Sequence, residues 1–237
     1  MVMREKNREN ICIILAKANS KGLKNKNIIS FNGKPMLYHT INPILKSQIF
    51  DKIIVSTDSR KIQSLAYKFG AEAPFLRPKK LATNSVSFHK ALVHSMDWIN
   101  KEYGKYKNVL YAFPTNPLRE NRDFRKAYNL LKKLESDLII SVSENSHPSY
   151  WSNELKLDHS MRNFIPKKYC VNRQELPKTY RVDGSIFFGK WNILYNYNKR
   201  NFFNVNSHAM IMPRSRSVDI DTYQDFLLAK VKLNEKK

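Results

Sequence analysis

Short apolar runs alternate with stretches of helical periodicity along most of the chain. The apolar runs are bounded by polar residues, which predicts buried strands at Ile11–Ala16, Lys52–Ser56, Val109–Phe113, Leu138–Val142, Ser185–Phe188 and Ala209–Met212. Apolar residues three or four positions apart predict helices over 37–45, 62–69, 88–99 and 124–131. A last helix is predicted from about Thr222, with Phe226, Leu227 and Val231 facing inward. This alternation predicts an α/β fold with a parallel or mixed sheet covered by helices.

The alternation stops between Asn145 and Pro177. This segment is polar, aromatic and interrupted by prolines, and it shows no clean period. A long stretch of this kind inside a compact domain is usually a functional insertion. We therefore interpret residues 145–177 as an inserted lid or dimerisation segment, and residues 1–144 together with 178–237 as one α/β domain.

Length and composition agree with one globular unit. The 237 residues suffice for an α/β domain with a small subdomain, and 42% apolar residues can build its core. No apolar run approaches the roughly 20 residues that span a bilayer, and Ile11–Ala16 is too short for a signal peptide. Cys12 lies in a predicted strand, far in sequence from Cys170, which favours a buried free thiol. These features predict a cytoplasmic protein with no membrane contact.

The chain is strongly basic, with 42 Lys and Arg against 20 Asp and Glu and a formal charge of +22. One interpretation is an anionic partner, such as a nucleotide, an acidic sugar or a nucleic acid. The other is a compositional bias spread over solvated surfaces. The basic residues are scattered and accompany no RNP, zinc-finger or homeodomain pattern, which favours the second interpretation for most of the charge. Anion binding is expected in one loop.

That loop follows the first predicted strand and runs from Lys17 to Asn27. Ligands bind at the carboxyl ends of strands in open α/β sheets. Gly22 permits a positive φ, so that successive backbone N–H groups can turn toward one anion. The side chains that can surround a triphosphate are Lys17, Lys21, Lys24, Lys26, Ser20 and Asn27. The loop matches neither a Walker loop nor a dinucleotide-binding fingerprint. Without the other motifs, a solvated basic loop is therefore a simpler interpretation than a phosphate-binding loop.

An acidic pair stands near the C-terminus, within Ser217–Thr222. In an extended chain Asp219 and Asp221 point to one face, because the side-chain period is two. Two adjacent carboxylates repel unless a cation lies between them, and such ligands suit Mg²⁺ bridging substrate phosphates, with Mn²⁺ as the alternative ion. The other interpretation is that Asp221 caps the helix beginning at Thr222, which leaves Asp219 unexplained.

Other positions also allow a structural interpretation. Asp58 follows one strand and precedes a helix, where we expect a helix cap rather than catalysis. The turn from Pro114 to Arg119 is either a rigid platform for a sugar or an ordinary turn with Arg119 salt-bridged at the surface. The histidines show no metal-ligand spacing.

Together these motifs resemble those of CMP-sialic acid synthetases (acylneuraminate cytidylyltransferases), a family that includes legionaminic and pseudaminic acid cytidylyltransferases. The Lys17–Asn27 loop is similar to the family signature Ala-Arg-x-x-Ser-Lys-Gly-Leu/Ile-x-x-Lys-Asn. Further matches follow in the same order at Gly33–Pro35, Ser56–Asp58, Gly70–Glu72, Leu76–Pro78, Leu81–Ala82, Pro114–Thr115, Pro117–Arg119, Arg173–Gln174, Leu176–Pro177, Gly184 and Asp219–Asp221. Each piece is short, but their collinear order along nearly the whole chain is specific.

The resemblance implies a Rossmann-like, three-layer nucleotidyltransferase fold with a mixed sheet and a small inserted dimerisation subdomain, and therefore a homodimer. It implies a Mg²⁺-dependent cytidylyltransferase that transfers CMP from CTP to an acidic nine-carbon sugar and releases pyrophosphate. Such a product would serve the synthesis of surface glycans, lipopolysaccharide or capsule.

The resemblance also implies roles for individual residues. The expected CTP contacts are Ala16, Lys17, Ser20, Lys21, Gly22, Lys26, Asn27, Arg77 and Ser87, with Arg77 and the 81–87 loop on the cytosine. Lys21, Lys26 and Asp221 are expected to be catalytic, and Asp219 and Asp221 to hold the metal. The expected sugar contacts are Thr115, Arg119, Arg173 and Gln174, with Arg173 near the sugar carboxylate.

Four positions depart from the family pattern. Lys17 replaces an arginine, Phe88 a small polar residue, Phe113 a glutamine and Asp183 an asparagine. The departures concern the sugar pocket most, because the other phosphate lysines and both aspartates are kept. The acceptor is then an N-acylneuraminate or legionaminate, or alternatively a pseudaminate or 3-deoxy-octulosonate type of sugar. A rival of another class is a catalytically lapsed homologue that binds nucleic acid, against which the intact loop and acidic pair argue.

Overall fold

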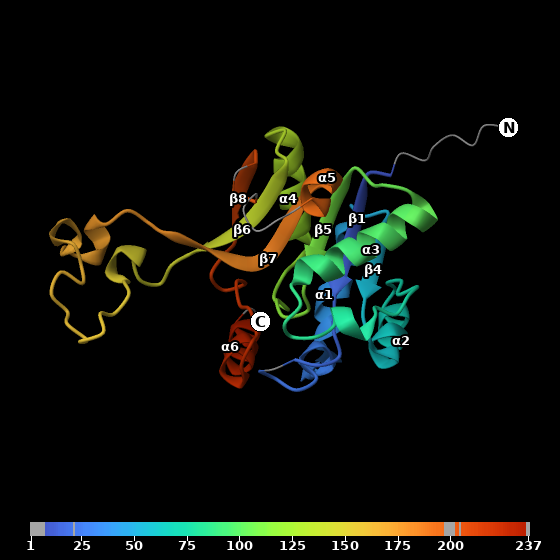
Figure 1. Cartoon of the computed structure of the whole chain (residues 1–237), viewed down its shortest axis with the longest axis horizontal. Coiled ribbons are helices and arrows are strands. Elements are labelled where there is room, and N and C mark those ends of the chain that lie inside the picture. The colour runs from blue at the N-terminus through green and yellow to red at the C-terminus, as the bar shows by residue number, and fades with distance from the viewer. Residues whose placement is uncertain (1–7, 21, 197–201, 204, 236–237) are drawn as a thin grey trace.

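The computed structural model describes residues 8–20, 22–196, 202–203 and 205–235. Its centre is a six-stranded sheet in the order β4-β1-β5-β7-β6-β8 (Figure 1). The strands are β1 Asn10–Leu15, β4 Lys52–Ser56, β5 Asn108–Ala112, β6 Leu138–Glu144, β7 Tyr180–Lys190 and β8 Ser207–Ile211. β1 runs parallel to β4 and β5, whereas β7 is antiparallel to its neighbours β5 and β6. The predicted α/β class with a mixed sheet is confirmed.

Helices cover both faces of this sheet. They are α1 Met36–Ser47, α2 Arg60–Lys68, α3 Phe88–Tyr103, α4 Asn121–Lys133 and α5 Trp191–Tyr195. Cys12 and Ile14 of β1 pack in one cluster with α1, α2 and α4, and the alternating Ile11 and Ile13 pack with α3 and α5 on the opposite face. Because both faces are covered, every residue of β1 is buried, as expected for a parallel strand inside a three-layer fold.

The last helix, α6 Tyr223–Asn234, packs at the rim of the sheet. It contacts a small hairpin formed by β2 Ser30–Phe31 and β3 Lys34–Pro35 through a third apolar cluster that contains Phe31 and Phe226. Phe226 is buried as predicted, but Leu227 and Val231 are 44% and 55% exposed, so their predicted inward orientation is wrong. The reason is that α6 buries only a narrow stripe, through Phe226 and Ala229, against the hairpin.

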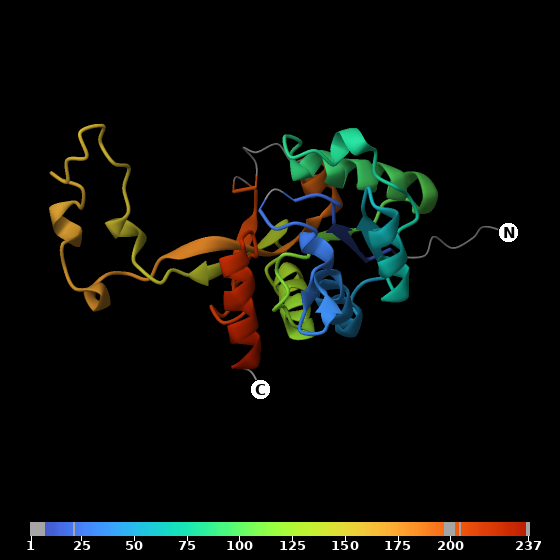
Figure 2. The same ribbon diagram turned by 90° about the horizontal axis from the view of Figure 1, so that it is seen from below.

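The chain between β6 and β7 extends away from the sheet (Figures 1 and 2). We call residues 145–179 the arm. It contains three short 3₁₀ turns, Ser149–Trp151, Lys167–Tyr169 and Arg173–Glu175. Its internal contacts include a hydrogen bond from Trp151 Nε1 to the carbonyl of Tyr169 at 2.9 Å and stacking of Tyr150 on Tyr169. Whether the arm acts in dimerisation or as a lid stays a prediction.

β7 begins earlier than the predicted Ser185–Phe188 segment. Tyr180 pairs with Glu144 at the base of the arm, so that the two strands continue together beyond the covered part of the sheet. The first residues of β7 are exposed there and carry no apolar run, which is why the sequence pattern does not reveal them.

The prediction of a buried free thiol at Cys12 is confirmed. Cys12 is buried and Cys170 exposed, and both are free thiols. Burial raises the pKa of the Cys12 thiol, which keeps it protonated and unreactive.

Across the described ranges, no helix has the length and apolar character that crossing a bilayer would require.

Candidate functional site

The carboxyl ends of β1 and β4 are joined through Asp58. Its Oδ1 accepts a hydrogen bond from the backbone N–H of Ala18 at 2.8 Å. The cap of α2 is the next residue, Ser59, whose hydroxyl accepts a hydrogen bond from the N–H of Ile62. The prediction that Asp58 caps this helix is therefore wrong. Aspartate and serine are equally good caps, so that two such residues in a row leave the sequence ambiguous.

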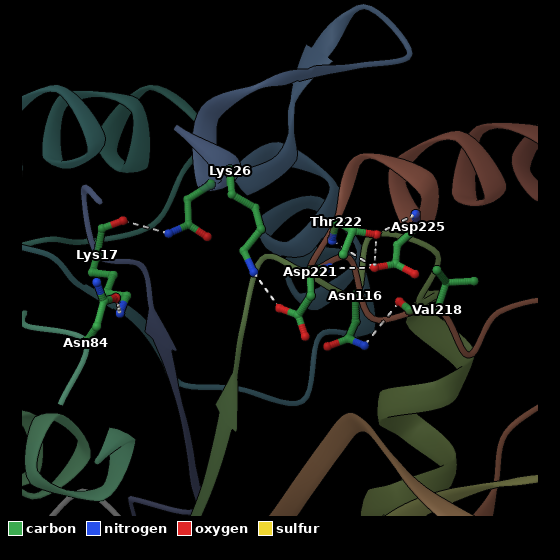
Figure 3. A network of polar contacts seen from close by, with 9 residues as sticks. Lys17, Lys26, Asn84, Asn116, Val218, Asp221, Thr222 and Asp225 are labelled. Atoms are coloured by element: carbon green, nitrogen blue, oxygen red, sulfur yellow. Dashed lines mark hydrogen bonds and ion pairs between the residues drawn. The ribbon is translucent and has the colours of Figure 1, made fainter. Parts of the chain in front are cut away.

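Side chains fix the rest of the loop after β1. We call residues 16–27 the basic loop; it ends in the 3₁₀ turn η1 Lys26–Ile28. Asn27 is buried and its Nδ2 donates to the carbonyl of Lys17 at 2.7 Å. Lys17 Nζ in turn donates to Asn84 Oδ1 at 2.6 Å, in the loop before α3 (Figure 3). Lys21, expected to be catalytic, lies outside the described residues.

The acidic pair lies across from the basic loop, just before α6. Val218 and Ile220 are buried in the third apolar cluster, so that the alternating Asp219 and Asp221 face outward. The N–H of Ile220 donates to the carbonyl of Thr115 at 2.9 Å, which holds this segment at the end of β5. The two carboxylates thus share one side, as their spacing predicts.

Asp221 does not cap α6. The cap is Thr222, which exchanges hydrogen bonds with Asp225 in a reciprocal capping box (Figure 3). Asp221 instead accepts a hydrogen bond from Lys26 Nζ at 2.8 Å, with the lysine side chain 12% exposed and the aspartate side chain 73% exposed. The capping interpretation of Asp221 is therefore excluded, and the lysine joins the basic loop to the acidic pair.

Gly22 lies where these two segments touch. A Cβ atom built on Gly22 would clash with the backbone carbonyl oxygen of Asp221. A backbone atom cannot swing aside as a flexible side chain can, so that only glycine fits here without moving one of the two segments. Gly22 does not adopt the positive φ that the sequence suggested, so the reason for glycine here is this close approach and not backbone conformation.

The electrostatics of Asp219 suit a cation. Partial burial raises the pKa of Asp219 above its ordinary value, and the neighbouring Asp221 carboxylate adds to the rise. A hydrogen bond from Thr115 and the positive charges of Lys26 and Arg119 act in the opposite direction without cancelling it. Two carboxylates in this state gain from a cation placed between them.

The ligand set also fits a hard divalent ion bound together with substrate. In the part of the chain that the structure describes, no group of three or more His, Cys, Asp or Glu side chains could hold a metal alone. Mg²⁺ is commonly held by one or two carboxylates, with substrate phosphates and waters completing its shell. Asp219 and Asp221 match that pattern, although their binding of a metal stays a prediction.

A cavity of about 180 Å³ opens between the basic loop, the start of α3 and the end of β5. Among its lining residues are the expected substrate contacts Lys17, Ser20, Lys26, Asn27, Arg77, Ser87 and Thr115. Ala16 and Gly22 lie on the adjoining backbone. The structure thus brings most of the expected CTP contacts to one cavity, which we call the nucleotide cavity.

Arg77 presents unused hydrogen-bond donors in this cavity. Arg77 is only 5% exposed, and its Nε and Nη2 atoms have no hydrogen-bond partner within the described ranges. Burial lowers the pKa of Arg77, while the charge of Asp58 raises it. Unpaired buried donors cost free energy unless a ligand satisfies them, which agrees with the expected contact to a cytosine carbonyl.

Two aromatic side chains that the sequence marked only as departures from the family pattern form an apolar wall of the cavity. Phe88 and Phe113 both line the nucleotide cavity. Phe88 stacks on Tyr111 with ring centroids 5.2 Å apart and meets Phe113 edge-on at 5.9 Å. Their positions, at the start of α3 and directly after β5, were the available signal, because both lie at the ligand edge of the sheet.

Arg119 does not reach the cavity. It is 3% exposed, and its guanidinium donates to the carbonyls of Ser185 and Phe113 and to the hydroxyl of Thr40. This corrects the expectation of a surface salt bridge, and Arg119 is not among the residues that line the nucleotide cavity. The arginine instead ties the turn after β5 to β7 and α1.

Arg173 and Gln174 also lie apart from the acidic pair. They occupy the arm and line a separate hollow at its base, together with Glu144 and Pro177. Within one chain the structure therefore does not bring these two expected sugar contacts to the nucleotide cavity.

Comparison with known proteins gives consistent matches. A family model described as Cytidylyltransferase matches residues 11–232. A pseudaminic acid cytidylyltransferase of Campylobacter jejuni is 32% identical over 224 residues, which are 94% of this chain and 95% of that protein. An N-acylneuraminate cytidylyltransferase of Escherichia coli is 33% identical over 228 residues, 96% of this chain and 52% of that protein.

A solved structure shares the fold. It is that of CMP:2-keto-3-deoxy-manno-octonic acid synthetase complexed with CTP, with a TM-score of 0.72 and 15% sequence identity. The match covers 97% of this chain and 100% of the other. The likeness extends to the mixed sheet and its helices, and at this identity it concerns the fold alone.

Proposed function

The chain belongs to the cytidylyltransferase family, and we propose that it transfers CMP from CTP to an acidic nonulosonic sugar with release of pyrophosphate. The named relatives act on pseudaminic acid and on N-acylneuraminate, which supports this class of acceptor. The observation that carries the proposal is the Lys26–Asp221 contact at 2.8 Å, because it joins the basic loop that lines the nucleotide cavity to the acidic pair.

The nucleotide cavity supplies complementary groups for CTP. The unpaired donors of Arg77 suit the carbonyl oxygen of cytosine, and the apolar wall of Phe88 suits a base. The triphosphate then lies along the basic loop, where Lys26 and the backbone beside Gly22 face the acidic pair. This orientation directs the α-phosphate toward Asp219 and Asp221.

The reaction is an in-line displacement at the α-phosphorus. The anomeric hydroxyl of the sugar attacks, a new P–O bond forms, the bond to the β-phosphate breaks, and pyrophosphate leaves with the hydroxyl proton passing to solvent or phosphate. Lys26 neutralises charge on the phosphates and the basic loop positions them, which is how proteins chiefly accelerate phosphoryl and nucleotidyl transfer.

Asp219 and Asp221 are the residues that would hold Mg²⁺, or Mn²⁺ in its place. When bound, the ion supplies neutralisation of the triphosphate charge. Lys26 Nζ contacts Asp221 at 2.8 Å, so that holding an ion at Asp221 would require the carboxylate to share this contact or to give it up.

We also propose that the chain forms a homodimer through its arm. Apolar side chains of the arm are exposed, including Leu155 at 61% and Met161 at 60%. None of the arm's residues belongs to the three apolar clusters that the described residues form. A second copy would bury these side chains, and it could carry Arg173 to a site that its own chain does not reach.

A pyrophosphate-release assay tests the proposed activity. CTP, UTP, ATP and GTP are each incubated with Mg²⁺ and with N-acetylneuraminate, legionaminate, pseudaminate, 3-deoxy-octulosonate or neutral mannose as the control. We expect release with CTP and at least one acidic nine-carbon sugar. Absence of release in every combination, with salt-sensitive binding of RNA or DNA, would instead favour the lapsed nucleic-acid-binding homologue.

A further inference from the structure

A second cavity adjoins the nucleotide cavity at the acidic pair. Its volume is about 320 Å³, and Asp219 lines it. Thr115 lines the nucleotide cavity and donates a hydrogen bond to Asp219, so that this contact separates the two cavities. The second cavity lies over the ends of β6 and β8 and the start of β7, which is the same edge of the sheet.

Three cationic side chains converge on this second cavity from different elements. Arg181 lies on β7, Arg214 follows β8, and Lys232 lies on α6. Lys232 Nζ donates to the backbone carbonyl of Arg214 at 2.6 Å, which holds two of the three elements together. Burial lowers the pKa of Lys232, and the charges of Arg214 and Arg181 lower it further, as expected where like charges gather.

The carboxylates that line the second cavity interact with other groups of the protein. Glu144 lines the cavity but pairs with Lys178 at 3.0 Å. Asp225 is bonded in the capping box of α6. Asp219 belongs to the acidic pair that faces the nucleotide. The three cationic side chains can therefore bind an anionic ligand.

Buried hydroxyl groups in the same cavity point to a ligand independently. Ser143 and Ser217 are 1% and 5% exposed and both line it. Their Oγ atoms have no hydrogen-bond partner among the residues that the structure describes. Buried hydroxyls are nearly always bonded, so that these two are suited to a polar ligand that enters the cavity.

We infer that Arg181, Arg214 and Lys232 bind the carboxylate of the acceptor sugar, in the same chain that binds CTP. The inference rests on the proposed function. In-line attack requires the acceptor to approach the α-phosphate from the side opposite the leaving pyrophosphate, and this cavity lies across Asp219 from the basic loop. Arginine forks and hydroxyl donors match the two oxygens of a carboxylate, whereas a neutral sugar would leave the cations unpaired.

The test compares an acidic acceptor with its uncharged methyl ester. The sugar is the acid that the pyrophosphate assay identifies, and the variant is Arg214→Gln with Lys232→Gln. We expect the KM for the acid to rise roughly tenfold or more, because a hydrogen-bonded charge pair is lost, while the KM for CTP is unchanged. The preference for acid over ester should fall toward one.

Arg60→Gln with Lys61→Gln removes the same charges from the exposed start of α2 and serves as the control. It should keep the wild-type preference, and thermal unfolding confirms that both double variants fold. A cavity variant with the wild-type preference for the acid would overturn the inference and leave the proposed function intact. Loss of that preference in Arg173→Gln alone would also overturn it, in favour of the arm.

Calorimetry with each of the four acidic sugars of the pyrophosphate assay, added without CTP, separates the two proposals. Binding that the wild-type chain shows and the cavity variant lacks would support the cation site even if no pyrophosphate were released, and the proposed function alone would then fail. Equal binding of the acid by both proteins would overturn the inference whatever the result of the activity assay.

Discussion

A single methyl group added at Gly22 tests whether catalysis needs the close approach of the basic loop to the acidic pair. Gly22→Ala places a Cβ against the carbonyl of Asp221, so that the basic loop and the acidic pair must separate. We expect kcat/KM for CTP to fall tenfold or more, or about 1.4 kcal/mol of transition-state stabilisation, in a steady-state pyrophosphate assay.

Gly33→Ala is the matched control for this change. Gly33 has a φ of +77° and open space around its Cβ position, so that alanine there introduces backbone strain without a clash. It should lower stability by about 1 kcal/mol and leave kcat/KM for CTP unchanged. Full activity of Gly22→Ala would show that the close approach has no part in catalysis.

Arg119 provides a second test, which separates a structural role from a substrate contact. Burial lowers the pKa of Arg119 to about 10, so that the group stays charged at neutral pH. Arg119→Met would leave the carbonyls of Ser185 and Phe113 without their donor. We expect a loss of about 3 kcal/mol in the free energy of unfolding, measured by urea denaturation.

The opposite result for Arg119 would restore the role expected from the sequence. Unchanged stability combined with a raised KM for the sugar would mean that the guanidinium reaches the acceptor. A conservative Arg119→Lys variant, which keeps the charge but cannot reproduce the donor fork, should lie between the wild type and Arg119→Met in stability.

Single residues also show what the sequence could and could not reveal. Lys26 and Asp221 could be singled out from the sequence by their residue types and motifs, and the structure brings them into contact; their roles toward phosphate and metal stay predictions. The surface salt bridge considered for Arg119 was wrong, because a sequence pattern shows which residue follows a turn and not whether its side chain is buried; its contact with the sugar stays a prediction. Phe113 was recognised only as a departure, because an aromatic residue after a strand is usually part of the core.

At the scale of elements, the cap of α6 holds the acidic pair in place and can be tested separately. Partial burial acts to raise the pKa of Asp225, but hydrogen bonds from Thr222 and from the backbone of Asp221 lower it overall. A carboxylate whose pKa is lower in the folded state stabilises the fold above its unfolded-state pKa of about 4, and this contribution is lost as the pH falls through the folded value.

Thr222→Ala should therefore cost about 1 kcal/mol and lower the Tm by about 2–4 °C at pH 7, measured by calorimetry. Asp225→Asn should cost stability at pH 7 and less at pH 3, where the wild-type carboxylate is itself becoming protonated. A cost that stays constant between pH 7 and pH 3 would contradict the assigned role of the Asp225 charge.

The elements also differ in how well their sequences predict them. β1 and β4 were located to within about a residue, because strands covered on both faces read as unbroken apolar runs. The start of β7 was missed because it pairs beyond the covered sheet. The face of α6 was misassigned because a helix at the rim can leave leucine and valine in solvent, and which stripe it buries depends on the hairpin that it meets.

At the scale of the whole molecule, the arm should govern assembly. Replacing Leu155, Leu157 and Met161 by serine should convert a homodimer into a monomer in light scattering after size-exclusion chromatography, because these exposed apolar side chains would lie in the interface. Far-UV circular dichroism should stay unchanged, since the arm packs against none of the apolar clusters of the described chain.

Leu227→Ser with Val231→Ser is the control for assembly. Both side chains are exposed apolar residues of the main body, on α6. The control should keep the wild-type mass. If the arm variant also remains a dimer, or if the wild type is a monomer at assay concentrations, assembly through the arm is wrong. The sequence located the arm by its broken periodicity, but that pattern carries no information on whether a second copy packs against the arm.

The most direct measurement is identification of the product by mass spectrometry. The chain is incubated with CTP, Mg²⁺ and an acidic nine-carbon sugar, in parallel with Asp221→Asn. The account predicts a CMP ester of the sugar in equal amount to pyrophosphate for the wild type, and neither product for the folded Asp221→Asn variant. Pyrophosphate accompanied only by free CMP, or full activity of Asp221→Asn at saturating Mg²⁺, would contradict it.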